Sequence, residues 1–231
     1  MTATEHEPLA AIERRARELG LALRGACHAL PGEFATLLPD VVTGTVVLVG
    51  FTGSVQWPAF AASVEARDGL SHPLDRWSER VVGRLAAEFG AHAAYPSGTP
   101  ALPFQQLAMR CEAVHPSPVG LLIHPQWGLW HAYRGALILP GRLALPASPV
   151  QASPCATCAG RPCLSGCPVA AFGATGFDLP ACVAHVTTPA GGACIERGCR
   201  AREACPVGAE HRYLPAQMRF HMQAYVRAVR P

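Results

Sequence analysis

The sequence predicts two domains, an α/β (α+β) domain at residues 1–145 and a smaller cysteine-rich domain at residues 146–231. In the first part, short apolar runs that suit buried strands alternate with stretches of helical periodicity, which favours helices layered on a sheet. In the second part, eight of the ten cysteines are clustered. A proline-rich stretch from Pro140 to Pro154 separates the two patterns, so we place the domain boundary there.

The first half of the larger domain predicts two helices and one strand. Residues 8–20 have an apolar stripe at helical spacing, made of Leu9, Ile12, Ala16 and Leu19. The apolar run at residues 46–49 lies between glycines and suits a buried strand. Residues 73–89 begin with a proline, which is favoured in a first helical turn, and repeat the helical pattern. We interpret these stripes as core packing.

The second half predicts shorter elements. Residues 91–95 suit a strand that leads into a proline- and glycine-rich turn, and residues 104–110 suit a short helix. Two apolar runs, at residues 119–123 and 132–139, suit further strands. Residues 213–230 predict a closing helix, because apolar side chains recur on one side of it.

Composition excludes several classes of function. The net charge of +3 is too small to indicate nucleic acid or an anionic membrane as a partner. The chain has no lysine, which excludes a Schiff-base lysine and a P-loop nucleotide site. The first residues lack a signal-peptide pattern, and no apolar run has the length of a membrane span. We therefore expect a cytoplasmic protein with no nucleic acid and no membrane partner.

In a reducing cytoplasm, ten cysteines are not expected to form structural disulfides. Cys27 and Cys111 stand alone, and each is expected to be a small buried hydrophobe. The other eight form two groups whose clustering indicates metal binding. The first group is Cys155-x2-Cys158-x4-Cys163-x3-Cys167 followed by proline. The second consists of Cys182 and then Cys194-x4-Cys199-x5-Cys205 followed by proline.

This spacing favours two [4Fe–4S] clusters in a bacterial-ferredoxin-like domain. A recurring arrangement has three cysteines in one loop and a further cysteine, followed by proline, that binds the neighbouring cluster. The step from Cys163 to Cys167 is one helical turn, so it carries ligation from one cluster to the next. Zinc bound by four thiolates is the alternative, although zinc ribbons favour a repeated Cys-x2-Cys and this chain has one such pair.

The cysteine run at residues 155–168, the single Cys182 and the stretch at residues 192–206 resemble the iron–sulfur domain of epoxyqueuosine reductases. Those enzymes are cobalamin-dependent and related to the reductive dehalogenases. The resemblance implies that one cluster is bound by Cys155, Cys158, Cys163 and Cys205. It implies that the second cluster is bound by Cys167, Cys182, Cys194 and Cys199.

The chain departs from that family at the position of the acid. The family has a catalytic aspartate, the proton donor, just before a Ser-x-Pro segment. Here the corresponding stretch is Tyr95-Pro96-Ser97-Gly98-Thr99-Pro100, and no acidic residue lies between Gly90 and Cys111. The chain also lacks the C-terminal helical extension associated with tRNA. We therefore do not expect epoxyqueuosine reduction.

An aromatic and basic patch precedes the cysteines, made of His124, Trp127, Trp130 and His131. One interpretation is a wall for a corrinoid such as cobalamin, and the other is the packing of a strand pair.

Three functions fit the sequence. The first is transfer of single electrons through two clusters, with a redox protein partner as electron donor or acceptor. The second is a corrinoid-dependent reductase of an unknown substrate, since a ferredoxin that only carries electrons does not need an N-terminal domain of this size. The third is a zinc-stapled interaction module.

Overall fold

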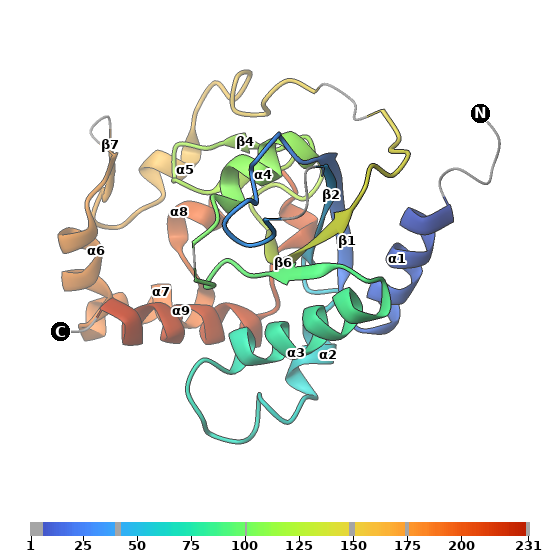
Figure 1. Cartoon of the computed structure of the whole chain (residues 1–231). Helices are drawn as coiled ribbons and strands as arrows, with labels where there is room; N and C mark the ends of the chain where they lie inside the picture. The colour runs from blue at the N-terminus through green and yellow to red at the C-terminus, as the bar shows by residue number, and fades with distance from the viewer. Residues whose placement is uncertain (1–6, 40–42, 100, 148–150, 174–175, 230–231) are drawn as a thin grey trace. The chain divides into compact units, whose positions relative to one another are not determined.

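The computed structural model describes residues 7–39, 43–99, 101–147, 151–173 and 176–229 (Figure 1). The chain divides into two compact units. Described residues within 1–113 and 132–150 form the N-terminal unit, and those within 114–131 and 151–231 form the cysteine unit. Residues 114–131 therefore belong to the cysteine unit, whereas the domain boundary at residue 146 stays a prediction.

The N-terminal unit contains one four-stranded sheet. Its elements are α1 (Glu7–Glu18), β1 (Ala22–His28), β2 (Gly44–Thr52), α2 (Trp57–Ala61), α3 (Pro73–Glu88), β3 (His92–Ala94), α4 (Phe104–Cys111) and β6 (His131–Pro140), of which β6 begins with a residue of the cysteine unit. The strand order is β1-β2-β6-β3, and the β1–β2 and β3–β6 pairs are antiparallel. This arrangement is α+β, with helices packed on an antiparallel sheet, rather than a parallel α/β layer.

Strand β2 lies at the centre of this unit. Every residue from Gly44 to Thr52 is buried, which explains why the sequence shows a continuous apolar run instead of an alternation. Trp77 of α3 packs on Phe51 of β2 and on Phe60 of α2, with ring centroids 5.6 Å and 6.0 Å apart. This aromatic cluster holds α2 and α3 against the sheet.

Strand β1 is the sheet strand of this unit that the sequence does not predict. Its side chains are mostly half-buried, and it carries Arg24 and Gly25, so neither an apolar run nor an alternation appears. A Cβ atom at Gly25 would lie 2.3 Å from the carbonyl oxygen of Cys111, so only glycine lets the end of α4 come this close to the strand. The register with β2 shifts between Leu23 and Gly25, as at a β-bulge.

The segment before α3 is held by a pair of charges. Arg80 of α3 donates from Nε and Nη2 to the two carboxylate oxygens of Glu65, at 2.5 Å and 2.9 Å. This hydrogen bonding lowers the pKa of Glu65 to about 2. The stability that it contributes is therefore complete above the ordinary glutamate pKa and is lost as pH falls toward 2.

We expect Glu65→Gln to lower the free energy of unfolding by about 1–2 kcal/mol at pH 7, because a charge-assisted pair is lost and Arg80 is partly screened by solvent. The difference from wild type should shrink as pH falls from about 4.5 toward 2. Urea unfolding at several pH values measures it. Glu79→Gln, an exposed residue beside Arg80, is the control. A pH-independent difference would contradict the assignment.

The cysteine unit consists of short elements. They are β4 (His115–Pro116), β5 (Leu122–Ile123), α5 (Pro162–Ser165), β7 (Phe172–Gly173), β8 (Gly176–Phe177), α6 (Leu179–Val186), η1 (Pro189–Gly191), α7 (Gly192–Arg197), α8 (Arg200–Glu203), η2 (Ala209–His211) and α9 (Pro215–Val229). The predicted closing helix is confirmed as α9, whereas the run at residues 119–123 contains only the two-residue strand β5. A ferredoxin-like arrangement of this unit stays a prediction. Within the described residues, no helix combines the length and apolarity needed to cross a membrane.

Candidate metal centre

The first thiol set joins cysteines from two parts of the cysteine unit. Its members are Cys155, Cys158, Cys163 and Cys205. Burial raises the pKa of the Cys155, Cys163 and Cys205 thiols, and the neighbouring thiols of the set raise it further. Cys163 lies on α5, whereas Cys205 lies just after α8. Four thiols from separate stretches of chain therefore lie within electrostatic reach of one another.

The second thiol set is built from helices α6 and α7, the N-cap of α8 and the loop after α5. Its members are Cys167, Cys182, Cys194 and Cys199. Burial raises the pKa of the Cys182 and Cys194 thiols, with further contributions from Cys167 and Cys199. The hydroxyl of Tyr225 on α9 donates to Sγ of Cys182 at 3.6 Å. That these sets bind two clusters, as the resemblance to epoxyqueuosine reductases implies, stays a prediction.

Helix α5 links the two sets. Cys163 is inside it, and Cys167 follows its end by two residues. Between them, a Cβ atom at Gly166 would lie 2.7 Å from Cβ of Ala204 and 3.1 Å from the carbonyl oxygen of Arg200. Glycine is therefore needed for α5 to pack on α8, which brings Cys163 toward Cys205.

Backbone N–H groups point at several of the sulfurs. The N–H of Ala171 donates to Sγ of Cys167 at 3.4 Å. The backbone of Arg200 hydrogen-bonds Cys194, and that of Val207 hydrogen-bonds Cys205. These bonds lower the pKa of the two thiols, whereas burial raises it by more. Such donors favour the thiolate, which is the form that binds metal. The donor set therefore fits iron–sulfur ligation.

Apolar residues from the segment 114–131 pack against cysteines of the first thiol set. Val119, Ile123 and Leu129 form one buried cluster with Cys163 and Cys205. This contact explains why the segment belongs to the cysteine unit, and why its apolar run does not continue as a strand. A second buried cluster packs Cys194 against Val186 and Val226, with Cys182 beside it. Cys167 and Cys199 of the second set also pack against the first cluster, so the two thiol sets share part of their apolar support.

No three His, Cys, Asp or Glu side chains among the described residues converge as the ligands of a single metal ion do. The thiol sets are defined by electrostatic proximity, and not by convergence on one point.

The aromatic patch proposed from the sequence lies in the cysteine unit. Trp130 is 1% exposed, with the guanidinium of Arg202 4.5 Å from its ring and the ring of Tyr213 5.4 Å away. Buried His131 interacts through Nε2 with the carbonyl oxygen of Leu122. These two side chains are occupied in packing.

His124 and Trp127 keep exposed surface. The Nδ1 atom of His124 accepts hydrogen bonds from the N–H groups of Gln126 and Trp127 at 3.0 Å and 3.2 Å. The ring of Trp127 lies 4.6 Å from that of His211. Of the four patch residues, these two are the ones that a ligand could reach.

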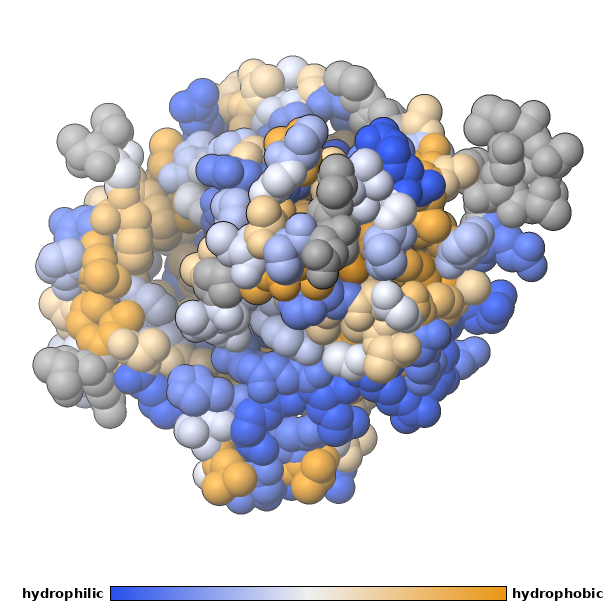
Figure 2. All heavy atoms as spheres, in the orientation of Figure 1, coloured by the Kyte–Doolittle hydropathy of each residue, from blue (hydrophilic) through white to orange (hydrophobic). Residues whose placement is uncertain are grey.

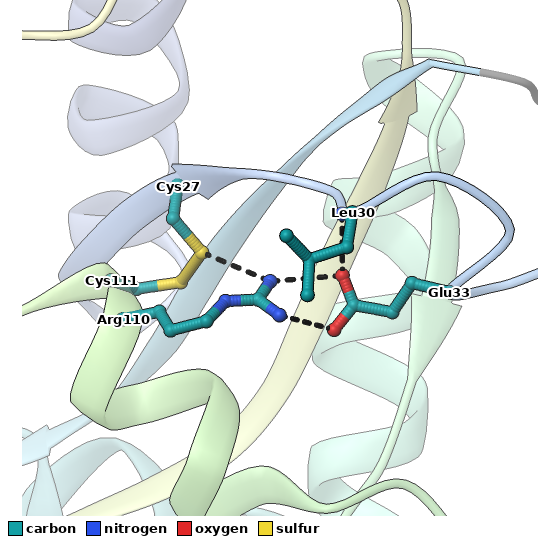
Figure 3. The surroundings of a disulfide bond; sticks show 5 residues. All are labelled: Cys27, Leu30, Glu33, Arg110 and Cys111. Carbon is teal, nitrogen blue, oxygen red and sulfur yellow. Dashed lines mark hydrogen bonds and ion pairs between the residues drawn. A yellow bond between two sulfur atoms is a disulfide. The ribbon is translucent and has the colours of Figure 1, made fainter.

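The expectation of two isolated buried thiols in the N-terminal unit is wrong. Cys27 of β1 and Cys111 of α4 form a disulfide, with Cα atoms 4.6 Å apart (Figure 3). The sequence could not show this pairing, because it depends on β1, which the sequence does not predict, and on the close approach at Gly25. The other eight cysteines are free thiols.

A cavity of about 210 Å³ lies in the N-terminal unit beside the stretch that lacks the family's acid. It is lined by Asp75, Ser78, Tyr95, Pro96, Ser97 and Arg134. Asp75 comes from α3, far earlier in the sequence, so a search of the local motif does not find it. Burial raises the pKa of Tyr95, whose hydroxyl donates to the carbonyl oxygen of Glu79. The cavity therefore places a carboxylate and a guanidinium around one small space.

No protein-family model matches the chain, and no curated protein matches it by sequence. Among solved structures, the epoxyqueuosine reductase of Streptococcus thermophilus is similar, with a TM-score of 0.55 and 15% identity over 87% of this chain and 66% of the reductase. The C. elegans B12-trafficking protein CblC is similar with a TM-score of 0.53 and 14% identity, over 94% of this chain and 92% of that protein. At these identities the likeness shows a shared fold. The chain spans just under two thirds of the reductase's length.

Proposed function

We propose that the protein is a cytoplasmic iron–sulfur redox protein that transfers single electrons through two [4Fe–4S] clusters. The observation that carries the proposal is the grouping of eight thiols into two sets of four, each drawn from separate stretches of chain. In a cubane each thiolate binds a different iron, so its four sulfurs stand farther apart than those around one zinc ion. A bound cluster supplies a site that gains or gives one electron.

The chain's own residues would set the properties of these sites. Cys155, Cys158, Cys163 and Cys205 would hold one cluster, and Cys167, Cys182, Cys194 and Cys199 the other. The N–H groups directed at Cys167, Cys194 and Cys205 would stabilise negative charge on the sulfurs and so raise the reduction potential. Apolar support beneath each set would keep water away from one side of the cluster.

A redox protein partner would approach the second set from the side of α6. Cys182 on this helix is partly exposed. Hydrophobic side chains gather over α6 (Figure 2), and Phe177 and Leu179 at its start are 45% and 44% exposed. Exposed apolar surface near a redox centre suits a transient docking partner.

Arg161 is expected to tune the first cluster. Its positive charge lowers the pKa of the Cys155 and Cys163 thiols, although burial outweighs it. The same charge favours the reduced, more negative cluster. Arg161→Gln should therefore lower the potential of one cluster by roughly 20–60 mV, where 59 mV is a tenfold change for one electron. Potentiometric EPR measures it. Arg219→Gln, whose guanidinium pairs with Glu196, is the control. Unchanged potentials in Arg161→Gln would exclude this effect.

The proposed electron transfer is tested by EPR of anaerobically purified protein. Chemical reduction should produce signals from two [4Fe–4S]⁺ centres, and reoxidation by a one-electron acceptor should remove both without loss of iron. A protein that gives no such signal, and that carries stoichiometric zinc instead, would be the zinc-stapled interaction module.

A corrinoid-dependent reductase is the second candidate, because the likeness to CblC covers 94% of this chain. Its test is retention of added cobalamin through gel filtration, with a changed corrinoid spectrum. Trp127→Ala should weaken retention if the exposed part of the patch holds the corrinoid, and Phe177→Ala is the control on exposed aromatic surface. If wild type retains no corrinoid, the electron-transfer function stands alone.

A further inference from the structure

The Cys27–Cys111 disulfide joins β1 to the last residue of α4, across 84 positions of sequence. It lies wholly in the N-terminal unit, apart from the eight free thiols. A charged group is directed at one of its sulfurs (Figure 3).

That group is the guanidinium of Arg110. Its Nη2 atom lies 3.8 Å from Sγ of Cys27. Glu33 fixes it from the other side by accepting from Nη1 and Nη2 at 2.6 Å and 2.9 Å. The N–H of Leu30 holds the carboxylate in turn, at 2.9 Å. The pKa of Glu33 is lowered because these hydrogen bonds outweigh the opposing effect of burial, so the pair is ionised.

The contact between Arg110 and Cys27 matters mainly in the reduced state. A disulfide has no net charge, so a cation beside it gains little. A thiolate at Cys27 would interact favourably with the same guanidinium, which lowers the pKa of a neighbouring thiol. Arg110 therefore favours reduction of this disulfide and makes Cys27 the sulfur that is more readily ionised.

The two sulfurs also differ in access. Cys111 is 4% exposed, and its backbone lies against Gly25. Cys27 is only half-buried. Of the two residues, Cys27 is therefore the more accessible to an incoming thiol, and it is also the one beside the cation.

We propose that Cys27 and Cys111 form a redox-active dithiol–disulfide couple that exchanges with dithiol substrates, with Cys27 as the exchanging sulfur and Cys111 as the resolving one. A partner thiolate attacks Sγ of Cys27, the Cys27–Cys111 bond breaks, and Cys111 leaves as a thiolate and takes a proton. The partner's second thiolate then attacks the mixed disulfide, and Cys27 leaves beside Arg110. Two electrons and two protons pass from the partner dithiol, which becomes a disulfide.

The asymmetry is tested by trapping the mixed disulfide. Glutathione disulfide serves as the probe, and peptide mass spectrometry separates these two cysteines from the other eight. Cys111→Ser should carry glutathione at Cys27, because no resolving thiol is present. Cys27→Ser should carry little or none at the buried Cys111. Circular dichroism and thermal unfolding check that both variants are folded. Equal labelling of the two variants, or none in either, overturns the assignment of roles.

The function of Arg110 is tested on the intact couple. Native wild type and Arg110→Gln are equilibrated in buffers of reduced and oxidised dithiothreitol, and the fraction of Cys27–Cys111 disulfide is quantified. The midpoint of Arg110→Gln should move by about three- to tenfold toward more reducing buffers, where tenfold corresponds to 29.6 mV for two electrons. An unmoved midpoint removes Arg110 from the proposal. A disulfide that dithiothreitol reduces only after unfolding identifies a structural bridge and overturns the couple. Iron content should be unchanged in Arg110→Gln, so this test is independent of the proposed clusters.

Discussion

A Cys167→Ala variant is expected to keep about four of about eight iron atoms per chain and to lose one of the two reduced-cluster EPR signals. The physical reason is that a cubane held by three thiolates loses iron readily, while the first thiol set is untouched. Cys163 lies one helical turn earlier but belongs to the other set. Cys163→Ala should therefore remove the opposite signal.

Ser165→Ala is the matched control for this pair of variants. Ser165 lies on α5 between the two cysteines, is exposed, and donates only to the carbonyl oxygen of Pro162 among its described contacts. Its iron content should equal that of wild type. If Cys163→Ala and Cys167→Ala lose the same signal, or neither loses iron, the division of the eight cysteines into these two sets is incorrect.

Replacing Arg24 by methionine is expected to lower the free energy of unfolding by about 3–5 kcal/mol. The side chains of Arg24 and Glu112 are 1% and 8% exposed, and their nearest charged atoms are 3.1 Å apart. Arg24 also donates to the carbonyl oxygen of Phe51 at 3.1 Å. Removing the guanidinium leaves the buried Glu112 carboxylate without its opposite charge and with the hydrogen bond from the Tyr133 hydroxyl. Burial already raises the pKa of Glu112 against the influence of Arg24.

The double variant Arg24→Met with Glu112→Leu tests the reason for that loss. With both charges replaced by apolar groups of similar size, no buried charge is left, so much of the stability should return. Chemical unfolding of the wild type, both single variants and the double variant gives the interaction free energy. A double variant that is less stable than Arg24→Met would show that the pair matters for packing and not for charge.

The helices were the most predictable part of the fold. α1 and α3 each bury one stripe, so their periodicity is visible in the sequence, and β2 is visible because it is buried throughout. β1 was missed because Arg24 and Gly25 serve tertiary contacts with the end of α4 rather than a strand pattern. In the run at residues 119–123, only Leu122 and Ile123 form a strand, and Val119 and Ile123 pack against thiols, which local periodicity does not reveal.

The cysteines of the candidate site could be predicted as a set from the sequence, because the spacing of metal ligands is a local sequence pattern. That either thiol set holds a cluster stays a prediction. The disulfide and Asp75 of the cavity could not be found in this way, since each depends on residues brought together by the fold. Arg202 shows the same limit, because the packing of its guanidinium against Trp130 and Tyr213 depends on residues that are distant in the sequence.

Acid-labile sulfide and iron in anaerobically purified protein test the central claim most directly. Two cubanes on these thiols predict about eight sulfide and about eight iron per chain, both lost together on oxidation. Native protein that contains no acid-labile sulfide would contradict the iron–sulfur account.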